Sequence, residues 1–123
     1  MRLMRFLDKE DKKIKYCTVE NKSNFLIDGD IFSNYKITNE KANISKILSP
    51  IIPKSILCIG LNYKKHAAEG NDKIPEYPIL FMKLANSIQN PEDPIIIPKY
   101  LESEAVDYEC ELAVIIGKHC KNA

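Results

Sequence analysis

The chain has 123 residues and a formal net charge of +1, with 45% apolar and 28% charged residues, a composition typical of a soluble globular protein with an ordinary core. It lacks the basic block that indicates binding to nucleic acid. No apolar stretch approaches the roughly 20 residues needed to cross a bilayer, and the amino terminus lacks the apolar core of a signal peptide.

The first fifty residues predict a small β domain. Two stretches, residues 1–7 and 14–20, are typical of strands and are separated by a charged turn. An Asp-Gly pair at 28–29 lies between two further apolar stretches and predicts a β-hairpin. The stretch 38–49 is polar with scattered isoleucines, which is compatible with a short helix.

After the prolines at 50 and 53 the pattern remains mostly β. Apolar runs typical of strands occupy 56–61, 79–84 and the second half of 107–117, whereas 62–70 predicts a short helix that ends at a glycine. These elements do not alternate in the manner of a βαβ protein. We therefore expect an α+β fold that is mostly β.

The stretch 107–117, written DYECELAVIIG, joins an acidic half to a run rich in Val and Ile. Alternate residues of a strand point to the same side, so Asp107, Glu109 and Glu111 would share one face. Burying such carboxylates unpaired is costly, and a divalent cation would stabilise all three at once. Oxygen ligands favour a hard ion such as Mg²⁺, Mn²⁺ or Ca²⁺. The alternative is an edge strand whose acidic face is solvated.

His66 and Glu69 lie in the predicted helix. Positions i and i+3 meet on one side of a helix, so Glu69 can hold the imidazole in one tautomer and let it act as a general base toward water. The alternative is an exposed pair worth a few tenths of a kcal/mol. The other histidine, His119, lies in a polar stretch and is expected at the surface.

Two further residues are candidates for binding substrate. Lys83 follows an apolar strand, where its ammonium group would either meet an anionic substrate or be solvated. Asn62 follows Gly60 and would either contact substrate or cap the helix.

Taken together, the segments ILCIGLNYKKHAAE, PEYPILFMKLANSI, DPIIIP and VDYECELAVIIGK resemble the fumarylacetoacetate hydrolase family. The likeness is to its acylpyruvase and 2-hydroxyhepta-2,4-diene-1,7-dioate isomerase branch. Motifs built around H-x-x-E, F-x-K and E-x-E occur in the family's order, over roughly residues 53–121.

The resemblance implies a mixed, mostly β fold around Mg²⁺ or Mn²⁺. It implies that residues 51–123 form the front part of the catalytic domain and that residues 1–50 form a small β domain before it. The E-x-E motif supplies two metal ligands, which are Glu109 and Glu111 in this chain.

The H-x-x-E dyad of the family carries over to His66 and Glu69. The family takes a third carboxylate ligand and an active-site lysine from further downstream, and Asp107 does not match that ligand. The chain therefore resembles the front half of a longer protein.

For the complete enzyme, the resemblance implies hydrolysis of C–C bonds in acylpyruvate-type diketo acids, with a homodimeric assembly. Other branches of the family tautomerise, decarboxylate or dehydrate a 2-oxo acid through the same metal enolate. Two rival hypotheses stay open for this chain, an inactive truncated fragment and a metal-binding β module without catalysis.

The four cysteines are scattered without a CxxC pair. Cys58 and Cys110 lie in apolar runs, where a reduced cysteine behaves as a small hydrophobic residue. We expect free thiols and a cytoplasmic location.

Overall fold

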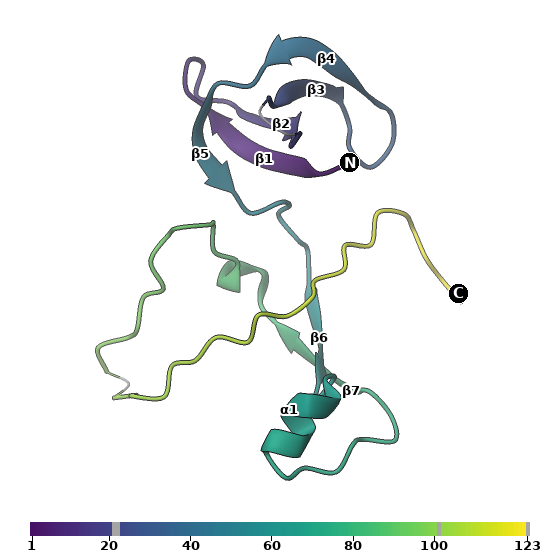
Figure 1. The fold of residues 1–123 in the computed structure, drawn as a ribbon, viewed down its shortest axis with the longest axis vertical. Coiled ribbons are helices and arrows are strands. Elements are labelled where there is room, and N and C mark those ends of the chain that lie inside the picture. Colours follow the sequence, from purple (N-terminus) through teal and green to yellow (C-terminus); the bar gives the residue numbers. More distant parts are fainter. Residues whose placement is uncertain (21–22, 101, 123) are drawn as a thin grey trace. The chain divides into compact units, whose positions relative to one another are not determined.

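A computed structural model describes residues 1–20, 23–100 and 102–122, and divides the chain into two compact units (Figure 1). The first unit contains residues 1–48 and the chain from residue 92 onward, and the second contains residues 49–91. The expected domain boundary at residue 50 stays a prediction.

The first unit is built on a five-stranded antiparallel sheet with the strand order β4-β3-β2-β1-β5 (Figure 1). Its strands are β1 (Leu3–Asp8), β2 (Ile14–Thr18), β3 (Phe25–Gly29), β4 (Tyr35–Lys41) and β5 (Ile44–Leu48). The strands predicted at 1–7 and 14–20 are confirmed as β1 and β2, which pair with Arg5 opposite Tyr16. The mostly β fold class is confirmed with them.

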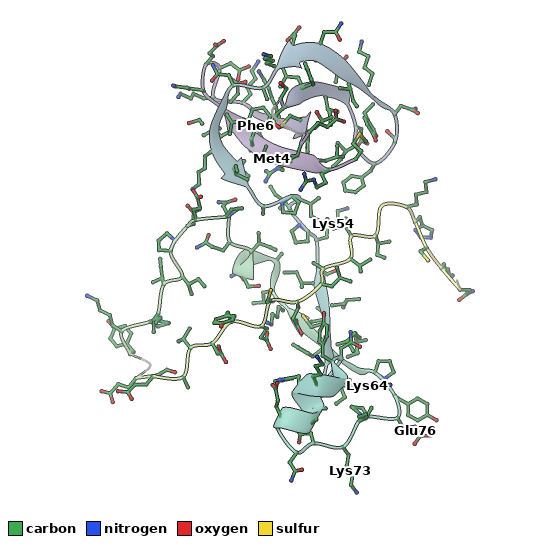
Figure 2. All side chains as sticks on the ribbon, viewed as in Figure 1. Met4, Phe6, Lys54, Lys64, Lys73 and Glu76 are labelled. Carbon is green, nitrogen blue, oxygen red and sulfur yellow. The ribbon has the colours of Figure 1, made fainter. Side chains whose placement is uncertain are left out.

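Phe6 lies at the centre of this sheet (Figure 2). It faces Lys15 of β2 and Ile47 of β5 in the register, and its side chain is fully buried together with that of Cys17. Burial raises the pKa of the Cys17 thiol, because the thiolate would lose its hydration. Phe6 and Cys17 therefore form the apolar core of the sheet.

A hairpin forms here, but the predicted turn at Asp28 and Gly29 is wrong, because the turn covers residues 30–34, where the second strand was expected. Gly29 is the last residue of β3 and has a φ of +106°. The chain then turns at Asp30, whose carboxylate accepts the N–H of Phe32 at 2.9 Å. The N–H of Asp30 donates to the carbonyl of Asn34 at 3.0 Å and closes the turn.

The short helix considered for residues 38–49 is wrong. The first residues of this stretch complete β4, and Ile44–Leu48 form β5. β5 pairs with β1, with Leu48 opposite Arg5. Because this partner is distant in the sequence, the local pattern of polar residues and isoleucines does not reveal it.

The buried strand expected within residues 107–117 is also wrong. This stretch has no regular secondary structure and its side chains are exposed. A strand needs a neighbouring strand that pairs with its backbone N–H and C=O groups, and this stretch belongs to neither sheet of the described residues. Cys110, with a φ of +51°, also interrupts the extended backbone.

The second unit contains the two-stranded antiparallel sheet of β6 and β7 with one short helix (Figure 1). Its elements are β6 (Ile56–Gly60), α1 (Lys64–Glu69), β7 (Ile79–Lys83) and a 3₁₀ turn at Ala85–Ser87. The two strands and the helix predicted here are confirmed. Gly70 ends α1, and its N–H donates to the carbonyl of His66 at 3.2 Å.

Candidate active site

The helix α1 presents His66 and Glu69 on its exposed side. Ala67 lies between them in the sequence. It is the one buried residue of the helix and anchors it. The distance from His66 Nδ1 to Glu69 Oε2 is 3.9 Å, and the two side chains are 68% and 78% exposed. This distance exceeds that of an N–H···O hydrogen bond. The carboxylate therefore attracts a protonated imidazole without fixing the tautomer through a direct bond.

Asn62 lies in a shallow cleft of about 260 Å³ in the second unit. The cleft is lined by Ile59, Gly60, Leu61, Asn62, Lys64, Ile74, Pro75, Glu76, Tyr77 and Pro78. The residue that caps α1 is Tyr63, and no side chain makes the capping hydrogen bond. The capping role considered for Asn62 is therefore wrong, whereas its role in substrate binding stays a prediction.

Lys64 and Glu76 are charged residues of this cleft that the sequence analysis did not single out (Figure 2). The sequence feature that could have indicated them is a pair of loops that meet at one end of the predicted strands. The first loop follows Gly60, and the proline-rich loop 74–78 leads into β7. Antiparallel pairing of β6 and β7 brings these loops to the same end of the hairpin.

Lys83 is the last residue of β7 and lies opposite Ile56 in the register. Gly60, which lines the cleft, is opposite Ile79 at the other end of the two strands. The structure thus places Asn62 in the cleft, whereas His66, Glu69 and Lys83 are not among the residues that line it.

Glu109 and Glu111 lie in the exposed chain from residue 102 to 122. Their carboxylates are the donor type that Mg²⁺ prefers. However, the shared face predicted for them depends on a continuous strand, and that strand is not formed. Nowhere in the described parts of the chain do three or more His, Cys, Asp or Glu residues group in a way that could hold a metal ion. These residues do not by themselves form a complete metal site.

A family model described as Fumarylacetoacetate (FAA) hydrolase C-terminal matches residues 55–123. A second model, described as Rv2993c-like, N-terminal, matches residues 1–47.

Named relatives match the chain over most of its length. It is 45% identical over 122 residues to a Dictyostelium discoideum protein named Fumarylacetoacetate hydrolase domain-containing protein 2 homolog, a match that covers 99% of this chain and 35% of that protein. It is 52% identical over 83 residues to a Xenopus laevis protein named oxaloacetate tautomerase fahd2, mitochondrial, which covers 67% of this chain and 25% of that protein. The chain thus spans between a quarter and just over a third of these relatives.

A solved structure described as Crystal structures of Cg1458 has a related fold. The TM-score is 0.62 at 25% sequence identity, and the match covers 81% of this chain and 38% of that one. The arrangement of elements in this chain is therefore similar to one found within a larger protein.

In the part of the chain that the structure describes, no helix has the length and apolar character that a membrane span requires. The Xenopus laevis relative is named as mitochondrial, so the cytoplasmic location stays a prediction.

The family model covers more than half of the chain, and its match includes His66, Glu69, Glu109 and Glu111. The three motifs singled out in the sequence, H-x-x-E, F-x-K and E-x-E, also lie within it. This chain belongs to the fumarylacetoacetate hydrolase family.

Proposed function

We propose that this chain supplies part of an active site that tautomerises a 2-oxo acid, with oxaloacetate as the leading substrate. The observation that carries this choice is the 52% identity to the relative named oxaloacetate tautomerase. Membership of the fumarylacetoacetate hydrolase family supports an enzyme of the hydrolase or isomerase type.

The reaction moves one proton and leaves the redox state unchanged. A base removes a proton from the carbon beside the 2-oxo group, and the C–H electron pair forms the C=C bond of the enol. The 2-oxo oxygen takes up a proton from water, and the protonated base returns its own proton to the solvent. We assign the base to His66, because its exposed imidazole can approach a bound ligand. Glu69, at 3.9 Å, would stabilise the imidazolium that forms.

The polar side chains near the hairpin would position the substrate. The amide of Asn62 can donate to a carboxylate or oxo oxygen, and the ammonium group of Lys83 can attract a carboxylate. Both assignments rest on residue type and on position. Asn62 lies in the loop after β6 and lines the cleft, and Lys83 is the last residue of β7.

Members of this family are in general metal-dependent. A bound Mg²⁺ or Mn²⁺ would act as a Lewis acid on the 2-oxo group. We assign Glu109 and Glu111 as two of its ligands, on the basis of their carboxylate oxygens.

Hydrolysis of an acylpyruvate is the second candidate function. It is favoured by the 45% identity, over 99% of this chain, to a relative named for the hydrolase domain. In this reaction His66 would remove a proton from water, and the hydroxide would add to the distal carbonyl. The C–C bond then breaks, and its electron pair stays with the pyruvate-like product, which takes up a proton.

The test uses a complete enzyme that contains this chain, in which His66 is replaced by alanine. Loss of a general base lowers turnover by roughly 10²- to 10⁴-fold. Ketonisation of oxaloacetate enol and release of pyruvate from an acylpyruvate would be measured side by side. His119→Ala is the matched control, because the chain has only these two histidines. Wild-type rates on both substrates in His66→Ala would reject His66 as the base. If the unsubstituted enzyme releases pyruvate but does not ketonise oxaloacetate enol, the result would favour hydrolysis.

A further inference from the structure

The backbone of Leu61 has an unusual conformation beside the cleft. Its φ is +50°, in the left-handed region, which bulky residues adopt only at a cost. Among the described non-glycine residues with a positive φ, Leu61 is the one that lines the cleft. Backbone strain of this kind concentrates at active sites and ligand-binding sites.

The pairing of β6 with β7 ends immediately before Leu61. Gly60 is the last residue of β6 and lies opposite Ile79, the first residue of β7. Pro78 precedes Ile79 and has no backbone N–H with which to extend the pairing. The chain therefore leaves the sheet at Leu61, where the left-handed conformation gives it a sharp change of direction.

The connection from β6 to α1 is short, because it consists of residues 61–63. The last of them, Tyr63, caps α1 and has an extended backbone, with a φ of −118° and a ψ of 118°. Asn62 lies between this extended residue and the left-handed Leu61, and it lines the cleft. The direction of the Asn62 amide therefore depends on the turn at Leu61.

The side chain of Leu61 explains why a less strained residue does not occupy this position. Glycine and asparagine adopt the left-handed conformation more readily than leucine. The leucine side chain, however, is half-buried and belongs to the apolar wall of the cleft together with Ile59 and Ile74. Leu61 thus has two separable properties, which are its backbone conformation and its apolar side chain.

We propose that Leu61 is a positioning residue that acts through Asn62. Its left-handed backbone directs the Asn62 amide toward a carboxylate or oxo oxygen of the bound 2-oxo acid. The inference rests on the substrate-binding role proposed for Asn62 above. An amide group has two N–H donors, so a change in its direction loses hydrogen bonds to the ligand. Affinity should therefore depend more on the backbone at residue 61 than on the side chain there.

The experiment separates these two properties in a complete enzyme that contains this chain. Leu61→Val keeps an apolar side chain, but its β-branch disfavours the left-handed conformation. Leu61→Asn loses the apolar side chain but accepts that conformation. Binding is measured by ligand-observed NMR with pyruvate, which carries both a carboxylate and a 2-oxo group. Turnover is measured with oxaloacetate enol.

Leu61→Val should weaken the binding of pyruvate and raise KM roughly tenfold, with kcat changed by less than about twofold, because the lost contact serves binding. Leu61→Asn should keep both the affinity and KM within about threefold of the unsubstituted enzyme. A role confined to stability would change the thermal midpoint without this division between KM and kcat.

Two further variants test how Leu61 acts. In an Asn62→Ala background, Leu61→Val should weaken the binding of pyruvate no further, because effects that pass through one residue are not additive. Asn71→Val is the matched control, because Asn71 has a φ of +57° but does not line the cleft. It should lower the thermal midpoint as Leu61→Val does and leave the binding of pyruvate unchanged.

Three outcomes would overturn the inference. The first is unchanged affinity for pyruvate in Leu61→Val. The second is weaker binding in Leu61→Asn than in Leu61→Val, which would assign the effect to the side chain. The third is an additive loss in the double variant.

Failure of the proposed function gives different results. Unchanged affinity in Asn62→Ala would reject the proposed role of Asn62 and this inference with it. An enzyme that binds pyruvate as expected but does not ketonise oxaloacetate enol would count against the tautomerase proposal alone.

Discussion

At the scale of single residues, Gly29 shows how one position determines a hairpin. Its φ of +106° lies in a region of backbone conformation that residues other than glycine rarely adopt. A Cβ at this position would collide with the carbonyl oxygen of Asn34, which belongs to the backbone of the turn. The glycine is therefore required both by its backbone angle and by the space beside it.

Replacing Gly29 by alanine should lower the free energy of unfolding by about 1–3 kcal/mol, the usual cost of a residue in a sparsely populated backbone region. Thermal unfolding followed by circular dichroism would measure the change. Gly60→Ala is the control, because a Cβ there would lie 3.4 Å from the Cβ of Ile79, an ordinary contact. Equal unfolding midpoints for Gly29→Ala and wild type would show that the turn relaxes without cost.

At the scale of elements, the turn between β1 and β2 is held by a small charge cluster. Asp8 accepts the N–H of Glu10 at 2.9 Å and pairs with the ammonium group of Lys15 at 3.1 Å. Lys15 also pairs with Asp11 at 2.9 Å. The pKa of the Asp8 carboxyl is lowered, first by the Glu10 N–H and then, against the opposing effect of burial, by Lys15.

This turn should make the stability of the first unit depend on acid pH. A carboxyl whose pKa is lower in the folded state stabilises that state above the unfolded value of 3.8, and the contribution disappears as the pH falls through the folded value. Asp8→Asn should therefore lower the thermal midpoint at neutral pH and flatten its fall below pH 3.8. Asp28 forms an exposed pair with Lys36, so Asp28→Asn is the control. It should change neither the thermal midpoint at neutral pH nor the fall of that midpoint in acid. An unchanged acid profile in Asp8→Asn would contradict the prediction.

Elements that depend on local sequence were predictable. The strands β1, β2, β6 and β7 follow from compact apolar runs, and α1 follows from the stretch 62–70, which ends at Gly70. β5 was missed because its strand character comes from pairing with β1, which is a long-range contact. The opposite error at residues 107–117 has the same cause, since a strand-like pattern forms a strand only beside a partner.

The candidate site was predictable to the same extent. The i, i+3 spacing of His66 and Glu69 is a local property of a helix, and the structure brings the two side chains to 3.9 Å. A metal site depends on residues brought together from several segments. Glu109 and Glu111 lie on one exposed stretch, so no local pattern could specify their further partners.

At the scale of the whole molecule, the exposed stretch 112–117 determines how the chain should behave in solution. Leu112, Val114 and Ile116 are 81%, 76% and 73% exposed. The segment LAVIIG is rich in β-branched residues and has neither charge nor proline. Such a segment pairs readily with strands of another chain.

The chain alone should therefore self-associate and bind Mg²⁺ weakly, since two carboxylates displace little of the tightly held water of this ion. Sedimentation velocity across a concentration series should show oligomers that Val114→Lys suppresses, because a charge in the segment opposes strand pairing. Ser103→Lys adds the same charge on the exposed stretch before the segment and should leave the oligomers unchanged.

Calorimetric titration should show no tight Mg²⁺ site, and Glu111→Gln should change little in the heat released. A stable monomer with a tight, Glu111-dependent Mg²⁺ site would mean that residues of this chain complete the metal site by themselves.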